Sequence, residues 1–257
     1  MAFGDTALKQ SDKGAEVAEL QLRLAGFRGT VPDGDYGGGT VLQVTTFQHD
    51  YMKMAHPTGQ ADKATLAAIA DFAGAFPVDF KLLVCPCGKC GGFGKGQFKG
   101  QWSSPNHSEA YYRYEYPGVH RMILWAYRAA MFYAKDLGWK LTINSGYRCS
   151  IDNANHGRTS TNHCGKAIDV DIMNPASKMI DMQNCDKMRG LLVEKANAQI
   201  GWGAKNRKSL EPRDIAPTWV HYDVRSYDSK YLDDSFFVKN AAALDGVAPK
   251  LGVDLPE

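Results

Sequence analysis

The chain has 257 residues, of which 44% are hydrophobic and 23% are charged, and its formal net charge is +2. This length and composition suit one or two ordinary globular domains, and so small a charge argues against a nucleic-acid partner. No segment is long and apolar enough to span a membrane. Residues 1–5 lack the basic and apolar regions of a signal peptide, so we expect synthesis in the cytoplasm.

Residues 1–75 carry the pattern of a small helical module. Apolar side chains recur at three- and four-residue spacing in segments 15–24 and 41–51, as on the buried faces of packed helices. The glycine-rich segment 33–40 between them permits positive φ angles, and Thr40 is placed to cap the second helix. Two helical patterns around a turn-rich middle predict a compact helical module.

Several motifs are spaced along this module. They are Leu20-Gln21-Leu22-Arg23-Leu24, then Asp33-Gly34-Asp35-Tyr36-Gly37 with Thr40, then Phe47-Gln48, and a degenerate segment at 59–66. In this order they resemble the peptidoglycan-binding domain 1 family, whose hallmarks are Leu-Gln-x-x-Leu, Asp-Gly-x-Phe-Gly-x-x-Thr and Phe-Gln. The resemblance implies that the last of these segments begins a third helix, and that this three-helix module binds bacterial peptidoglycan. The motif positions are mostly structural, so they do not tell which residues contact glycan.

Residues 76–104 are rich in glycine, cysteine and lysine, which is typical of a linker or hinge between domains. Three of the six cysteines lie in the segment 85–90, Cys-Pro-Cys-Gly-Lys-Cys. This spacing resembles half of a zinc knot, but no second pair of cysteines or histidines follows at a convincing interval. A disulfide within the cluster, or reduced thiols, is the favoured interpretation. A bond between Cys149 and Cys164 is a further option outside the cytoplasm.

Residues 105–257 alternate between helical and strand-like patterns. The expected elements are a helix over 118–138, a strand over 141–144, a strand over 166–172, a helix over 187–199 and a strand over 219–224. On a strand, period two places Asp169 and Asp171 on one face, and likewise His221 and Asp223. We therefore predict an α+β fold, in which a central antiparallel sheet flanked by helices follows the helical module.

Three polar motifs punctuate this second domain. They are Ser145-Gly-Tyr-Arg148, the segment Ser160-Thr-Asn-His-Cys-Gly-Lys-Ala-Ile-Asp-Val-Asp171, and Trp219-Val-His-Tyr-Asp223. Two imidazoles and one carboxylate suit Zn²⁺ and leave its fourth position open for water. Together the motifs resemble the zinc peptidases that include D-Ala-D-Ala carboxypeptidases, the vancomycin-resistance dipeptidase, phage L-alanyl-D-glutamate endopeptidases and the hedgehog fold. The resemblance implies one catalytic Zn²⁺ bound by His163, Asp169 and His221, with Asp171 as the fallback. His163 stands one residue closer to the aspartate than the family pattern has it.

The general base is not assigned by this resemblance. Many family members carry an acid three residues before the last histidine, where this chain has Thr218. Asp223 shares a strand face with His221 and is our first choice. Asp214 and Glu211 are weaker candidates from the preceding loop.

The resemblance also implies how the other polar residues act. Arg148 offers a planar fork of donors for a substrate carboxylate or a developing oxyanion. Ser145 and Tyr147 complete the predicted substrate-binding set. Zinc lowers the pKa of a bound water to about 7 and polarises the scissile carbonyl, while a carboxylate moves the proton to the leaving amine.

Both resemblances lead to the same polymer. A wall-binding module followed by a peptidase is typical of the modular endolysins that bacteriophages use for host lysis. We expect an L-alanyl-D-glutamate or cross-link endopeptidase, since cutting stems or cross-links causes lysis. The alternatives are a D-Ala-D-Ala carboxypeptidase and a catalytically silent wall-binding protein. The family habit implies a monomer that stays in the cytoplasm of the infected host until a holin releases it to the wall.

Overall fold

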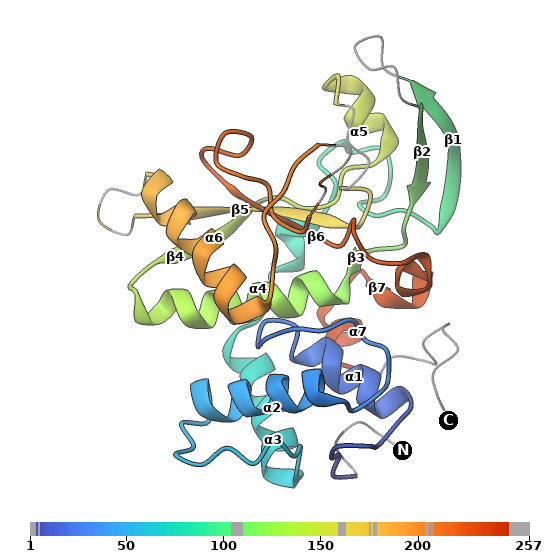
Figure 1. Cartoon of the computed structure of the whole chain (residues 1–257). Coiled ribbons are helices and arrows are strands. Elements are labelled where there is room, and N and C mark those ends of the chain that lie inside the picture. The colour runs from blue at the N-terminus through green and yellow to red at the C-terminus, as the bar shows by residue number, and fades with distance from the viewer. Residues whose placement is uncertain are drawn as a thin grey trace.

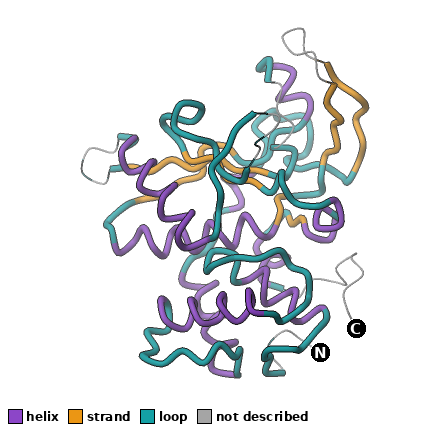
Figure 2. The backbone as a smooth tube through the Cα atoms, viewed as in Figure 1, coloured by secondary structure: helices purple, strands orange, loops and turns teal. Residues whose placement is uncertain are grey.

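Three helices at the N-terminus pack beneath a part of mixed helices and strands in the computed structural model (Figure 1). The structure describes residues 4, 6–103, 110–158, 163–174, 176, 179–203, 206 and 208–246. The helices are α1 (Ala15–Arg23), α2 (Gly38–Asp50), α3 (Lys63–Ala75), α4 (Arg121–Asp136), α5 (Ser150–Asn155), α6 (Met182–Ala196) and α7 (Ala241–Asp245), with 3-10 turns η1 (Phe80–Leu83), η2 (Ser229–Leu232) and η3 (Asp234–Phe236). The strands are β1 (Gln97–Ser103), β2 (Ala110–Glu115), β3 (Val119–His120), β4 (Lys140–Ser145), β5 (Ala167–Met173), β6 (Val220–Asp223) and β7 (Phe237–Val238). All of these strands follow the N-terminal helices in the chain, and Figure 2 shows them together in the part above those helices. The predicted α+β class is confirmed.

A buried glutamine holds together the turn between α1 and α2. The Nε2 atom of Gln21 donates hydrogen bonds to Asp33 Oδ1 at 2.7 Å and to Thr40 Oγ1 at 2.9 Å. Its Oε1 atom accepts from the backbone N–H of Gly34 at 2.9 Å, where φ is 73° and glycine is favoured. The Leu-Gln, Asp-Gly and Thr motifs are therefore one hydrogen-bonded unit. The prediction that Thr40 caps α2 was wrong: Gly37 is the N-cap, and Thr40 lies inside the helix.

The central sheet has the strand order β4–β5–β6, with both pairs antiparallel. Side chains alternate across β5, so Ile168 and Val170 face the core while Asp169 and Asp171 face the opposite side. Helices α4 and α6 cover the apolar face, where Ile123, Met188 and Ile168 help line a small apolar pocket. Packing on one face thus leaves the other face for polar side chains.

The ends of the two covering helices are set by caps. His120 caps α4, because its Nδ1 atom accepts from the backbone N–H of Met122 at 3.2 Å, and this begins the helix later than the predicted residue 118. Asp181 caps α6 by accepting from the N–H of Asn184 at 3.0 Å, which begins that helix five residues before the predicted 187. Neither cap interrupts the apolar periodicity on which the predictions were based.

Residues 76–104, predicted to be a linker, contain regular structure as well as turns. They include η1 and β1, and β1 pairs with β2 in a separate two-stranded sheet. Leu83 and Cys85 in this stretch are buried. Its glycines permit close packing: a Cβ on Gly94 would lie 2.3 Å from the hydroxyl oxygen of Tyr147.

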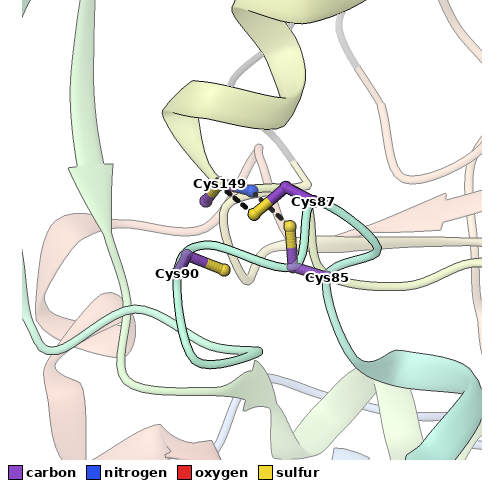
Figure 3. A group of neighbouring side chains, drawn as sticks. All are labelled: Cys85, Cys87, Cys90 and Cys149. Atoms are coloured by element: carbon purple, nitrogen blue, oxygen red, sulfur yellow. Dashed lines mark hydrogen bonds between the residues drawn. The ribbon is translucent and has the colours of Figure 1, made fainter.

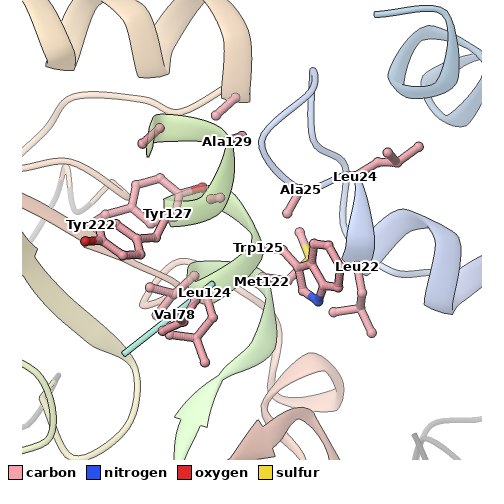
Figure 4. Packing of buried hydrophobic residues seen from close by; sticks show 14 of the residues in the cluster. Leu22, Leu24, Ala25, Val78, Met122, Leu124, Trp125, Tyr127, Ala129 and Tyr222 are labelled. Carbon is pink, nitrogen blue, oxygen red and sulfur yellow. The ribbon is translucent and has the colours of Figure 1, made fainter. Parts of the chain in front are cut away.

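Helix α1 of the N-terminal group packs directly against α4 of the following part. Buried apolar residues from both parts form one continuous cluster, and Figure 4 shows Trp125 of α4 beside Leu22 of α1. Gly26 permits this approach, since a Cβ there would lie 2.1 Å from the Cβ of Ala129. The two parts are therefore joined through a common core.

A buried ion pair crosses the same interface. The carboxylate of Glu19 on α1 accepts from both terminal nitrogens of Arg121 on α4, at 2.6 and 2.7 Å, and from Nε of Arg23 at 2.7 Å. Burial alone would raise the pKa of Glu19, but the attraction of Arg121 and then of Arg23 outweighs it, so the pKa is lowered. The carboxylate therefore remains charged between its two arginine partners.

We predict that Glu19→Gln lowers the free energy of unfolding by about 3 kcal/mol, because both arginines would keep buried charges without a carboxylate. Chemical denaturation of the full chain measures this change. Glu16→Gln on the same helix is the matched control, since Glu16 is less buried than Glu19. A loss no larger than that of the control would contradict the assigned role.

The pH dependence of the same pair has a definite sign. Because the folded-state pKa of Glu19 is lowered, its contribution to stability is complete above the ordinary pKa of a glutamate and disappears as the pH falls through the lowered value. The difference in free energy of unfolding between the wild type and Glu19→Gln should therefore become smaller in acid, as chemical denaturation at several pH values would measure.

Candidate metal centre

His163, Asp169 and His221 come together on the polar face of the central sheet. Asp169 of β5 stands directly opposite His221 of β6 in the antiparallel register, and His163 lies in the turn that precedes β5. All three side chains are buried, and one ligand atom from each lies within 4.8 Å of the others. The structure thus brings together the three residues that the sequence predicted as metal ligands.

Hydrogen bonds fix the orientation of each imidazole. Nδ1 of His163 lies 2.8 Å from the carbonyl oxygen of Gly146, which can only accept, so Nδ1 carries the proton and Nε2 remains a lone-pair donor. On the other ring, Nε2 of His221 lies 2.7 Å from Asp223 Oδ2, while Nδ1 lies 2.8 Å from Asp169 Oδ1. A ligand histidine held by a carboxylate or carbonyl on its second nitrogen is the usual arrangement around protein-bound metals.

Arg148 and the two histidines surround the carboxylate of Asp169. Its Oδ2 atom lies 3.3 Å from Nε2 of His163 and accepts a hydrogen bond from Arg148 at 2.8 Å. Burial alone would raise the pKa of Asp169, but His163 and His221 lower it far below its usual range. The group is therefore a carboxylate at any ordinary pH.

The two histidines differ in their protonation. For His221, burial opposes the charged form, but hydrogen bonds to Asp169 and Asp223 prevail and raise the pKa to about 9. For His163, burial is the main cause of a lowered pKa. A metal ion would displace the proton from Nδ1 of His221, and the set would then offer two imidazole nitrogens and one carboxylate, which fits the donor preference of Zn²⁺.

The structure separates Asp171 from this cluster. Both of its carboxylate oxygens accept from Nδ2 of Asn144 at 3.0 Å. Burial raises the pKa of Asp171, which is opposite in direction to the shift at Asp169. Asp171 thus has its own partner on β4 and stands beside the three-residue set.

The predicted substrate-binding residues lie in different surroundings. Arg148 reaches Asp169 at the edge of the cluster, and Ser145 pairs with Asp169 across the β4–β5 ladder. Tyr147 does not fit the predicted role, because its side chain is fully buried and its hydroxyl donates to the carbonyl of Tyr116 at 3.0 Å. Ser160, the first residue of its motif, lies outside the described residues.

The three candidates for general base also differ in position. Asp223 is fully buried behind His221. The Oε1 atom of Glu211 lies 3.8 Å from Nε2 of His221, the nitrogen that Asp223 also contacts. Asp214 is exposed in the loop that leads to β6. Arg225 was missed from the sequence, yet it contacts Asp223 through Nε and Glu211 through a terminal nitrogen at 3.3 Å. Its position in the turn just after β6, two residues beyond Asp223, was the available signal.

The first part of the chain has a family match. Residues 13–69 match the family model described as "Putative peptidoglycan binding domain". The chain carries a peptidoglycan-binding domain. Comparison with curated proteins gives no match. Among the described residues, no helix has the length and apolar character needed to cross a membrane.

This peptidoglycan-binding domain adjoins the strand that carries His221. A cavity of about 340 Å³ has Gly29 and Thr30, which follow α1, on its lining together with Tyr222 and Asp223 of β6. The domain therefore lies near the end of β6 as well as next to α4.

We predict that Asp169→Asn removes one equivalent of bound Zn²⁺ per chain, because it replaces an anionic ligand by a neutral amide. Asp171→Asn is the matched control, since it changes the same group two residues away on the same face and should leave zinc binding unchanged. Competition with a chromogenic chelator measures both. Loss of zinc in the Asp171 variant alone would move the ligand assignment to that residue.

Proposed function

We propose that the protein is a zinc-dependent peptidase that acts on the stem peptides of bacterial peptidoglycan. The observation that carries this proposal is the buried cluster of His163, Asp169 and His221 in a chain whose other part is a peptidoglycan-binding domain. The donor set supports hydrolytic chemistry, and the domain supports the choice of polymer.

The chemistry follows from the donors of the cluster. A zinc ion held by His163, Asp169 and His221 would supply an acidic bound water, with a pKa of about 7, and a Lewis acid for the scissile carbonyl. The carbonyl of Gly146 and the carboxylate of Asp223 keep the two imidazoles in their binding orientations. Since Arg148 stands at the edge of the cluster, its guanidinium is available to a substrate carboxylate or an oxyanion.

Within this proposal the general base is Glu211. Asp223 was our first choice from the sequence, but its carboxylate is already bound to His221 and Arg225, so its geometry suits a residue that positions the imidazole. The Oε1 atom of Glu211 lies 3.8 Å from Nε2 of His221, the nitrogen that faces away from Asp169, and Glu211 is also close enough to attract Arg148, which contacts Asp169. Asp214 is exposed and has no such contact with the cluster.

We predict that Glu211→Gln keeps its zinc but loses peptidase rate by about 10²–10⁴-fold, as expected when a general base is removed. Asp223→Asn should instead weaken zinc binding by about 10–100-fold, because it releases the far nitrogen of His221. Zinc affinity and turnover measured on both variants separate these roles. Equal zinc loss in both variants would overturn the assignment of Glu211.

The proposed bond is an amide in the stem peptide or in a cross-link, cut internally. An enzyme held on the wall that opens these bonds releases fragments, whereas removal of terminal D-alanine leaves the polymer intact. We further propose that the protein is a phage endolysin, that a holin releases it to the wall, and that it acts as a monomer. These finer statements rest on the resemblance of the polar motifs.

The test is mass spectrometry of fragments released from purified peptidoglycan. The wild type should release soluble peptides with new amino termini, while His163→Ala and chelator-treated protein should release none above background. Asp171→Asn serves as the active control. Release of free D-alanine alone would identify a carboxypeptidase, and sedimentation with the wall without any release would identify a protein that only binds.

A further inference from the structure

Three cysteines of one loop meet a fourth from a distant segment beside the turn that carries Arg148. Cys85, Cys87 and Cys90 lie in the loop after η1, and Cys149 is the N-cap of α5. Figure 3 shows the four side chains gathered at one point, and their sulfur atoms all lie within 4.8 Å of one another. This cluster is distinct from the His163 set because it contains only thiols.

The spacing of the sulfurs suits a tetrahedral ion. Zn–S bonds of about 2.3 Å place the sulfurs of a tetrahedral site about 3.8 Å apart. The Sγ atoms of Cys87 and Cys149 are 3.5 Å apart, well beyond a disulfide bond length of about 2.05 Å. All six cysteines of the chain are free. Four thiols with mutual distances in this range form the set that closed, structural zinc sites use.

Backbone N–H groups already point at the sulfurs. The N–H of Cys149 donates to Cys85 Sγ at 3.4 Å, that of Lys89 to Cys87 Sγ at 3.3 Å, and that of Asp152 to Cys149 Sγ at 3.4 Å. Donors of this kind stabilise thiolates and orient metal ligands. Gly88, with φ of 66°, allows the backbone to turn tightly between Cys87 and Cys90.

Lysine side chains compensate for the charge of such a site. Four thiolates around one divalent ion carry a net charge of about −2. Lys89, Lys95 and Lys99 line the same pocket as Cys90 and Cys149, together with one carboxylate, Glu115, so the net charge of this lining is positive and would offset part of that charge. Cys90 is only partly buried, which leaves a route for the ion to enter.

We propose that Cys85, Cys87, Cys90 and Cys149 bind a second zinc ion, with a structural role. The ion would tie the 85–90 loop to the segment that begins at Gly146. The two are already in close contact, since the N–H of Tyr147 donates to Leu83 O at 2.8 Å and a Cβ on Gly146 would lie 2.4 Å from the Cα of Leu83. The site thereby positions Arg148, which precedes Cys149, and the Gly146 carbonyl that orients His163.

The proposal predicts two zinc ions per reduced, full-length chain, one of which survives in His163→Ala. Metal analysis by mass spectrometry counts them. After loading with Co²⁺, His163→Ala should show the intense sulfur-to-cobalt charge-transfer absorption of a tetrahedral thiolate site. This readout does not depend on peptidase activity, so it stands even if the proposed function fails.

Cys90→Ser should lower the count by one and weaken the charge-transfer band, whereas Cys185→Ser, which removes a buried thiol on α6, should change neither. Absence of the sulfur band in Co²⁺-loaded, reduced His163→Ala protein would overturn the proposal. So would an unchanged zinc count in Cys90→Ser, or an intact mass that shows a disulfide between Cys87 and Cys149 in place of bound metal.

Discussion

The antiparallel register between β5 and β6 is the constraint on which the candidate centre depends. It places Asp169 opposite His221 and Ala167 opposite Asp223, so that Asp169 shares one face with both polar residues of β6. The opposite face of β5 is packed under α4 and α6, and a slip of one residue would exchange apolar and ionisable side chains across the sheet. The packing of Ile168 and Val170 therefore holds the histidine and the carboxylate together.

Local patterns in the sequence predicted much of this arrangement. Period two in the last strands was enough to put Asp169 and His221 on defined faces, and the apolar spacing after residue 118 was enough to predict α4. Long-range packing was not accessible in this way. Tyr147 stands in a motif that suggests substrate contact, yet it fills the space beside Gly94 and donates to Tyr116. Thr40 was predicted to be a helix cap, yet it lies inside α2 and its hydroxyl oxygen accepts a hydrogen bond from Gln21.

The stretch 76–104 shows why composition alone misleads. Its glycines suggest flexibility, but several stand where a side chain would collide, as Gly94 does against Tyr147 and the carbonyl of Glu115. The three cysteines of this stretch looked like half a site because the fourth is Cys149, next to Arg148 in another motif. A sequence search for a second pair of cysteines does not find a single cysteine that is distant in the chain, such as Cys149 at the N-cap of α5.

The shared core and the Glu19–Arg121 pair have a consequence for how the chain meets its polymer. A domain on a flexible linker raises the local concentration of substrate over a whole sphere of reach. Here the peptidoglycan-binding domain and the candidate metal centre are joined through a common core, which would hold them at one separation. Under the proposed function, the anchored protein would address only those stem peptides that project at one offset from its point of attachment. Only stem peptides at that distance from the attachment point would be cut, and the whole protein would have to dissociate before it could act elsewhere on the wall.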